Sequence, residues 1–288
     1  MIRQKSFQTN TGKLYLVATP IGNLEDMTFR AVRILTEVNY VYAEDTRVTK
    51  ILLSHFHIKT PLRSYHMYNE IEKCEEIIDL LKAGTNIAVV SDAGLPGISD
   101  PGYYIAKQAI DAMYDVIVIP GASAATTALL ASGLVIEPYL YIGFLSSKKS
   151  KKNQELDKLK DRHETIIIYE SIHRLKTTLE AIFVRLGDRQ IALARELTKK
   201  HEEIIRGSVS EIIQILDDLK GEFVLVISGK EKSADANQLN RLSLKEHYGH
   251  YLRLGLEEKE ILKKIASDKS LSKSDVYKEY LTIKNKRD

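Results

Sequence analysis

The sequence has a single cysteine, little net charge and no long apolar run, and each shortage excludes a class of protein. One cysteine, Cys74, cannot form an intramolecular disulfide and fits a reducing cytoplasm. No segment approaches the roughly 20 apolar residues that span a bilayer. The polar first residues lack the apolar core of a signal peptide. We therefore expect a cytoplasmic protein.

Charge and length set wider bounds. The net charge of +3 is too small to indicate nucleic-acid binding by itself, so only a local cluster of basic residues can do so. A chain of 288 residues is long for one domain and comfortable for two. Its content of 44% hydrophobic and 28% charged residues is typical of a folded globular protein.

Short β-rich runs alternate with helical patterns in the first part of the chain. We expect helices over about 27–37 and 70–83, and buried strands over 14–19, 38–43, 87–90 and 116–119. This alternation predicts parallel βαβ units. In such sheets ligands bind beyond the carboxyl ends of the strands.

The composition changes at 145–153, where four lysines occupy five positions, and the alternation then resumes. Here we expect helices near 171–187 and 208–220, and strands at 165–169, 191–194, 201–205 and 223–227. The fold class is therefore α/β with two α/β domains and a helical tail. We expect these at 1–120, 121–230 and 241–288, with a polar linker at 231–240.

The strongest local signal is the loop from Ser91 to Gly102, with three glycines and two prolines in twelve residues directly after an expected strand. Its backbone can approach a ligand closely, although glycine and proline also serve ordinary turns. Asp92 and Asp100 favour a cationic or hydroxyl-rich ligand over a phosphate. Neither P-loop nor dinucleotide-fingerprint spacing occurs, which argues against ATP and NAD.

Two further loops follow expected strands, at Pro20–Asn23 and Pro120–Ala125. Ser123 is expected to cap the alanine-rich helix that follows it. Taken in order, the three loops resemble the tetrapyrrole methylase superfamily of S-adenosylmethionine (SAM)-dependent methyltransferases. Within it, the sequence is most similar to the bacterial 16S ribosomal RNA cytidine 2′-O-methyltransferases. The segments that carry the resemblance are 16–24, 43–47, 91–102, 119–124, 143–145, 169–171, 173–174 and 194–199.

The sequence departs from the family's pattern at three positions. Leu95 replaces a usual threonine, while Ser146 and Ile172 each replace a usual proline. Each departure changes loop stiffness or a single contact, and none removes an expected charge.

The resemblance implies that SAM binds in a cleft between the two α/β domains and that the protein is a homodimer. A sulfonium donor needs acidic or carbonyl groups near its cationic end and an apolar slot for adenine. The positions that match the superfamily's cofactor-binding residues are Pro20, Asp92, Ala93, Gly94, Ile98, Ser123, Ala124, Tyr169 and Leu197.

The lysine cluster is the best nucleic-acid signal, because a flexible basic lip can pair with phosphates without reading sequence. A solvated loop between domains is the alternative. The resemblance favours RNA and makes 16S ribosomal RNA or the small ribosomal subunit the expected partner. The expected RNA-binding residues are Arg47, Lys148, Lys149, Lys151, Lys152, His173 and Arg174.

Methylation of a ribose 2′-hydroxyl needs alignment first and a proton acceptor second. The candidate bases are Asp45, Glu170 and Glu196, and Arg195 or Lys199 can stabilise a developing alkoxide. Ion pairing or helix capping is the alternative role for each acid, and catalysis by alignment alone stays open. The scattered histidines predict no metal site.

Two other functions stay open. One is a methylase of a tetrapyrrole or another small molecule with the same fold, which would need neither the lysines nor the tail. The other is a non-catalytic RNA-binding or ribosome-assembly factor that keeps a relic SAM cleft.

Overall fold

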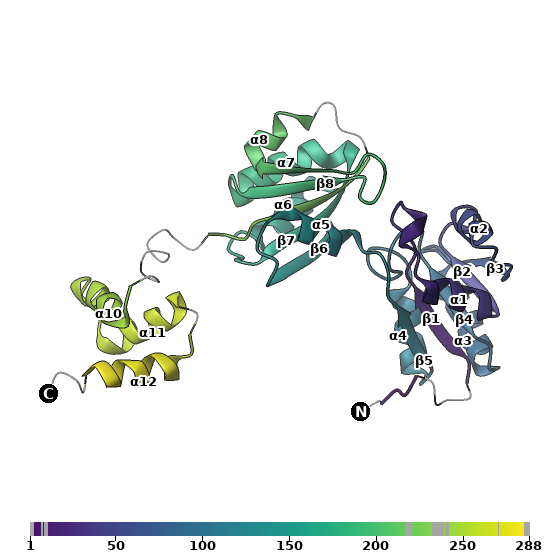
Figure 1. Cartoon of the computed structure of the whole chain (residues 1–288), viewed down its shortest axis with the longest axis horizontal. Coiled ribbons are helices and arrows are strands. Elements are labelled where there is room, and N and C mark those ends of the chain that lie inside the picture. Colours follow the sequence, from purple (N-terminus) through teal and green to yellow (C-terminus); the bar gives the residue numbers. More distant parts are fainter. Residues whose placement is uncertain are drawn as a thin grey trace. The chain divides into compact units, whose positions relative to one another are not determined.

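The computed structural model describes residues 3–6, 8, 11–216, 221–231, 239, 242–269 and 271–284 (Figure 1). Contacts along the chain divide it into two compact units, at residues 1–229 and 230–288. The first unit carries two β-sheets and the second is helical. The two-domain division of the first unit at residue 120 stays a prediction.

The first sheet is parallel throughout, as the alternating pattern predicts, and its strand order is β3-β2-β4-β1-β5. Successive residues of a strand face opposite sides, so both faces need cover. Leu14 of β1 packs in one core and Val17 in the other. The strands are β1 (Lys13–Val17), β2 (Tyr40–Ala43), β3 (Leu62–Ser64), β4 (Ile87–Val90) and β5 (Asp115–Ile119). The helices are α1 (Phe29–Glu37), α2 (Thr46–His55), α3 (Glu70–Lys82) and α4 (Tyr103–Asp111).

The second sheet has the order β6-β7-β10-β8-β9 and is mixed. Only β6 and β7 run parallel among its described pairs, and the other three pairs are antiparallel. The alternating sequence pattern therefore predicted the elements but not their directions. The strands are β6 (Tyr139–Phe144), β7 (Thr165–Ser171), β8 (Gln190–Arg195), β9 (Glu203–Ser208) and β10 (Glu222–Ile227).

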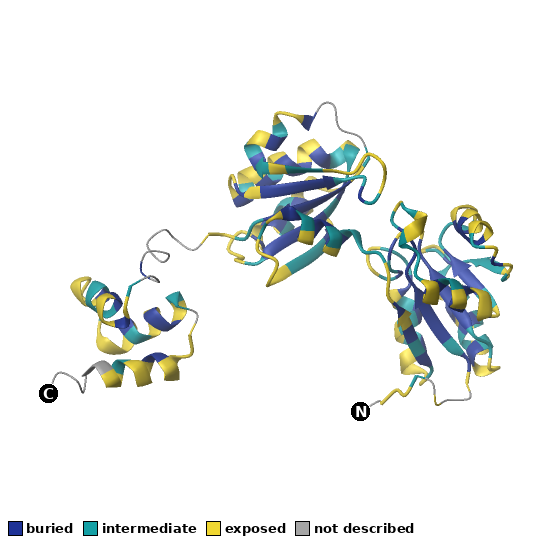
Figure 2. Ribbon diagram, viewed as in Figure 1, coloured by how far each residue is buried: buried dark blue, intermediate teal, exposed yellow. Residues whose placement is uncertain are grey.

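Helices cover both faces of the second sheet. On one face, α5 (Ala124–Ser132) packs Ala128 and Leu129 against Ile167 and Val224. On the other face lie α6 (Lys149–Asp157), α7 (Ile172–Leu186) and α8 (Val209–Ile213). The central strands of both sheets are mostly buried, whereas the edge strands β3, β6 and β9 are largely of intermediate burial or exposed (Figure 2). The α/β fold class with two such sheets is confirmed.

The second unit contains α10 (Leu244–Arg253), α11 (Glu258–Asp268) and α12 (Lys273–Lys284), as expected of a helical tail. Ile261, Ile265 and Val276 form the centre of its own apolar core. Most of the expected linker at 231–240 lies outside the described residues. None of the described helices is long and apolar enough to cross a bilayer.

Candidate functional site

The loops after β1 and β4 are tied together by their backbones. Thr19 N–H donates to Gly94 O at 2.9 Å, and Gly94 N–H donates to Thr19 O at 3.1 Å. The buried Thr19 hydroxyl adds a hydrogen bond to Ser91 O at 3.1 Å. Gly94 has φ +80°, a conformation that favours glycine. The glycine-rich loop is therefore held against the first loop at the carboxyl edge of the parallel sheet.

These loops form one wall of a cavity of about 620 Å³, and residues of the second sheet form the opposite wall. This size is within the usual range of small-molecule sites. The loops of the first sheet contribute Ile21, Glu44, Asp92, Ala93, Gly94, Leu95, Ile98, Ser99 and Asp100, and the start of α5, which packs on the second sheet, contributes Ser123, Ala124, Ala125 and Thr126. The opposite wall includes Tyr139, Tyr141, Phe144, Tyr169, Glu170, Ser171, Ala194, Glu196, Leu197, Lys199, Glu222, Phe223 and Val224.

The cavity is strongly acidic. Its described lining residues include six acids, Glu44, Asp92, Asp100, Glu170, Glu196 and Glu222, and Lys199 is the single lysine or arginine among them. Burial and the nearby carboxylates raise the pKa of Asp100 to about 7. Burial also raises the pKa of Glu44, followed by the effect of Asp92. Repulsion of this kind is relieved by a cationic ligand.

Ser123 does not cap α5 as the sequence predicted. It occupies the N-cap position, but its side chain makes no capping hydrogen bond there and lines the cavity. Tyr169 of β7 takes this role instead, because its hydroxyl accepts the Ala125 N–H at 3.0 Å. The N-terminus of α5, with its backbone N–H groups, and the hydroxyl of Ser123 therefore border the cavity.

Eight of the nine residues predicted to contact the cofactor line this single cavity. They include Tyr169 and Leu197, which are distant in the sequence and which no local pattern would place there. Pro20 does not line it, and its neighbour Ile21 does. These positions were predicted from the resemblance to the superfamily. The cofactor role of each residue stays a prediction.

Two of the four predicted catalytic residues lie outside the cavity wall. Asp45 caps α2 by accepting the Arg47 N–H at 2.8 Å, and its carboxylate pairs with the guanidinium of Arg47 at 2.6 Å. These hydrogen bonds hold the pKa of Asp45 down at about 2, which makes it a weak base. Arg195 pairs with Glu203 at 2.5 Å. The ion-pair and helix-cap alternative therefore describes Asp45, and Arg195 is engaged by Glu203.

The other two predicted catalytic residues line the cavity. Glu196 has the unusual φ of +50° and pairs with Lys199 at 3.2 Å. Glu170 is only 1% exposed, and both of its carboxylate oxygens accept hydrogen bonds, from Ser171 N–H at 2.9 Å and from the Thr178 hydroxyl at 2.6 Å. Glu170 therefore has the surroundings of a structural anchor rather than of a proton acceptor.

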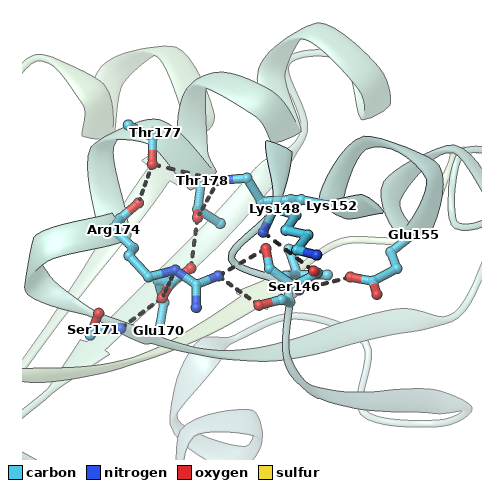
Figure 3. Close-up of polar contacts among 10 residues, drawn as sticks. Ser146, Lys148, Lys152, Glu155, Glu170, Ser171, Arg174, Thr177 and Thr178 are labelled. Carbon is cyan, nitrogen blue, oxygen red and sulfur yellow. Dashed lines mark hydrogen bonds and ion pairs between the residues drawn. The ribbon is translucent and has the colours of Figure 1, made fainter. Parts of the chain in front are cut away.

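Arg174 pairs with Glu170 and completes this group of contacts (Figure 3). Its side chain is 30% exposed, and its predicted role in RNA binding stays a prediction. Its Nε lies 3.4 Å from Glu170, and its Nη2 donates to Leu145 O at 2.6 Å. The guanidinium thus ties the segment after β6 to the start of α7. His173, next to it, is exposed and keeps its predicted role as a proposal.

The lysine cluster is helical rather than a flexible lip. Lys148 is the N-cap residue of α6, and Lys148, Lys149 and Lys151 are exposed. Lys152 is only 6% exposed and donates to the Thr178 hydroxyl at 3.2 Å. Burial lowers the pKa of Lys152. Lys152 is therefore removed from the predicted RNA-binding residues, because the helix turns it inward, and the RNA role of the three exposed lysines stays a prediction.

Sequence reasoning missed several cavity residues. Glu44 adjoins the predicted Asp45, and its strand-end position was an available signal. Glu222 begins β10, where nothing local distinguishes it from a solvent-exposed acid. A wider groove of about 760 Å³ shares Lys199 with the cavity and is also lined by Asn23, His55 and Lys200. No group of three side chains suited to hold a metal ion occurs in the described part of the chain.

Comparison with known proteins gives consistent matches. The family model for tetrapyrrole (corrin/porphyrin) methylases matches residues 13–213. The chain is 51% identical over 285 residues to ribosomal RNA small subunit methyltransferase I of Bacillus subtilis (strain 168), covering 96% of this chain and 98% of that protein. It is 46% identical to the protein of the same name from Halalkalibacterium halodurans, covering 97% of this chain and 99% of the relative.

Solved structures share the fold at low sequence identity. The methyltransferase CobJ matches with a TM-score of 0.59 at 16% identity, covering 76% of this chain and 95% of that chain. A uroporphyrin-III-C-methyltransferase from Thermus thermophilus matches with a TM-score of 0.55 at 22% identity, covering 75% and 94%. At these identities the likeness shows the fold alone.

Proposed function

The chain belongs to the tetrapyrrole methylase family and, within it, to the group of ribosomal RNA small subunit methyltransferases I, and on this premise we propose that it methylates small-subunit ribosomal RNA with SAM as the donor. The acceptor is the ribose 2′-hydroxyl of a cytidine in 16S ribosomal RNA, as the resemblance of its motifs implies. The observation that carries the donor half of the proposal is the acidic cavity.

The described residues fit SAM in charge, size and polarity. SAM carries a sulfonium and an ammonium group against one carboxylate. Glu170 and Glu196 are paired with Arg174 and Lys199, and the four other carboxyl groups of the cavity, those of Glu44, Asp92, Asp100 and Glu222, suit the net positive charge of SAM. Asp92 and Asp100 supply carboxylates, and Ala93, Gly94 and Leu197 supply close backbone or apolar contact. When bound, SAM supplies an electrophilic methyl group.

The chain's own contribution to the transfer is alignment. Asp45 and Glu170 are occupied by Arg47 and by the α7 anchor, so neither is set up to take a proton. Glu196 and Lys199 lie on the cavity wall as a pair, and an arriving hydroxyl would find both beside it. The loops hold donor and acceptor in fixed positions, which is a large part of any bimolecular rate enhancement.

The start of α6 supports an RNA acceptor. Lys148, Lys149 and Lys151 gather at the positive end of a helix dipole, and the first turn of α6 contains no acidic residue. Cations at this end are unfavourable unless an anion lies nearby. RNA phosphates would supply that anion, whereas a small apolar macrocycle would leave the lysines without a role. Arg47, with its side chain 88% exposed, is a further candidate contact.

We also propose that the protein works in the cytoplasm as a homodimer. The compartment is where ribosomal RNA is assembled in bacteria, and the lone thiol of Cys74 is buried, as suits a reducing environment. The dimer rests on the superfamily resemblance.

Methyl transfer from labelled SAM tests the proposal. Undermethylated small ribosomal subunits, their extracted RNA and a tetrapyrrole are offered in parallel. We expect label in the subunits or their RNA. Label in the tetrapyrrole alone would indicate a small-molecule methylase of the same fold. Absence of SAM binding in isothermal titration calorimetry would indicate a non-catalytic factor with a relic cleft.

A further inference from the structure

A bulge in β6 turns an aromatic side chain toward the cavity. The strand pairs with β7 through Tyr139 and Tyr141, then skips one residue, so that Phe144 lies opposite Tyr169. Without the skip, alternation would place residue 143 on the face shared by Tyr139 and Tyr141. Bulges often redirect a side chain beside a functional site. Here the redirected side chain is Phe144, which lines the cavity.

The glycine before it makes the bulge possible. Gly143 has φ +72°, and a side chain there would bring its Cβ within 2.9 Å of Ser99 Oγ. The Ser99 hydroxyl is hydrogen-bonded to the Tyr141 hydroxyl at 2.7 Å. The glycine-rich loop and β6 therefore meet at the point where Phe144 turns toward the cavity.

Phe144 is unusually exposed for an aromatic ring on a cavity wall. It is 55% exposed, and its ring contacts Tyr169 edge to face at 5.6 Å between centroids. Tyr169 is held in turn by the Ala125 N–H. The ring of Phe144 thus packs against a hydrogen-bonded neighbour and is still accessible, which suits stacking by a planar group.

The anchor of Figure 3 fixes the segment that joins this ring to the lysines of α6. Arg174 holds Leu145 O, and the Ser146 N–H donates to the Glu155 carboxylate at 2.9 Å. The buried Glu170 and Lys152 both contact Thr178 of α7. Phe144 and the exposed lysines that begin four residues later therefore lie on one segment, which these hydrogen bonds hold in place.

We propose that Phe144 is the stacking platform for the base of the acceptor nucleotide, with the flanking phosphates held by Lys148, Lys149 and Lys151. The proposal rests on the proposed function and adds to it a base-binding subsite at the cavity wall. An exposed aromatic ring followed by cations is a common arrangement for holding single-stranded RNA. Because every base has a flat face, this platform positions the nucleotide more than it reads its identity.

The test compares Phe144→Leu with Phe144→Tyr. Leucine keeps an apolar side chain and removes the aromatic face, whereas tyrosine keeps that face. Phe183→Leu is the matched control, because Phe183 is 42% exposed on α7 and does not line the cavity. The measurements are binding of undermethylated small subunits in the presence of S-adenosylhomocysteine, the KM for those subunits, and the Kd for SAM.

We expect Phe144→Leu to weaken subunit binding and raise KM by about tenfold or more, the usual effect of losing one stacked base. The SAM Kd should stay within about twofold. The salt dependence of binding should not change, because stacking releases no counterions. Phe144→Tyr should restore binding, and Phe183→Leu should behave as wild type.

Three results would overturn the proposal. Phe144→Leu could weaken SAM and not RNA, which would make the ring part of the cofactor wall. It could leave both affinities unchanged, or tyrosine could fail to restore binding. If wild-type protein binds the subunits but transfers no methyl group, the proposed function fails, while the binding comparison still decides the role of Phe144.

Discussion

The raised pKa of Asp100 gives a prediction about both the stability of the protein and its affinity for the cofactor. Its pKa is about 7 in the folded chain against an ordinary 3.8, because of burial first and then the carboxylates of Glu44, Asp92 and Glu222. Above pH 7 the carboxyl is ionised in both states, and the folded state bears the cost of the buried charge. As the pH falls through 7 the folded protein takes up a proton that the unfolded chain does not, so its stability rises.

The difference of about 3 pH units sets a ceiling of about 4 kcal/mol at high pH. The carboxyl borders an open cavity and is only partly buried, so we take half of that value, about 2 kcal/mol. Asp100→Asn removes the charge and should stabilise the ligand-free protein by this amount at pH 8.5. The expected rise in Tm is about 6 °C for a unit of this size. At pH 5.5 the wild-type carboxyl is largely protonated, and the gain should fall to about half.

Differential scanning calorimetry at the two pH values measures the effect. Asp111→Asn is the matched control, since Asp111 lies on the exposed side of α4 with Lys107 and should change stability by less than about 0.5 kcal/mol. The same Asp100→Asn variant should bind SAM about tenfold more weakly at pH 8.5, because a carboxylate opposite a cation is lost. Wild-type affinity for SAM should rise as the pH increases through 7, and that of the variant should not. Destabilisation at pH 8.5, or a gain that grows as the pH falls, would refute the reasoning.

Three further predictions concern the remaining charges. Changing Lys148, Lys149 and Lys151 together to Ala should weaken subunit binding and reduce the slope of log K against log salt by about 2. The control Lys152→Ala should leave the slope unchanged. Equal slopes for the two variants would show that the exposed lysines do not bind RNA phosphates. Arg174→Ala should cost about 2 kcal/mol in thermal unfolding, because Glu170 keeps a buried charge without its ion-pair partner. Arg174→Lys should not restore the loss, since one ammonium cannot reach both Glu170 and Leu145 O. A stable Arg174→Ala protein with weak RNA binding would contradict this structural role and support the predicted role of Arg174 in RNA binding. Asp92→Ala should weaken SAM binding by about tenfold in isothermal titration with subunit binding unchanged, and the opposite pattern would move the cofactor site elsewhere.

The strands and loops that build the cavity could be predicted from sequence because their signals are local. Ile87–Val90 is a run of buried β-branched and small residues, and the glycines and prolines that follow it indicate a loop. In a parallel sheet the chain order of such loops also places them at one edge. The shared cavity of Asp92, Ser123 and Leu197 follows from order and resemblance together.

What could not be predicted depends on three-dimensional partners. Lys152 differs from Lys151 only by its position on the helix, and the buried Thr178 that receives it lies in another helix. Ser123 had the residue type of a helix cap, but the hydroxyl of Tyr169 took the Ala125 N–H. Asp100 could be recognised as an acid, but its raised pKa comes first from burial and then from Glu44, which follows another strand, and from Asp92. The alternating sequence pattern also does not indicate that most strands of the second sheet are antiparallel.

The central claim is methyl transfer from SAM to a ribose of small-subunit RNA, and nucleoside mass spectrometry tests it most directly. Undermethylated small subunits are incubated with the protein and SAM bearing an isotopically labelled methyl group, and the RNA is then digested to nucleosides. We predict the label on 2′-O-methylcytidine with wild-type protein and much less of it with Asp92→Ala at limiting SAM. Label on a base, or no label in RNA from subunits that the protein binds, would contradict the claim.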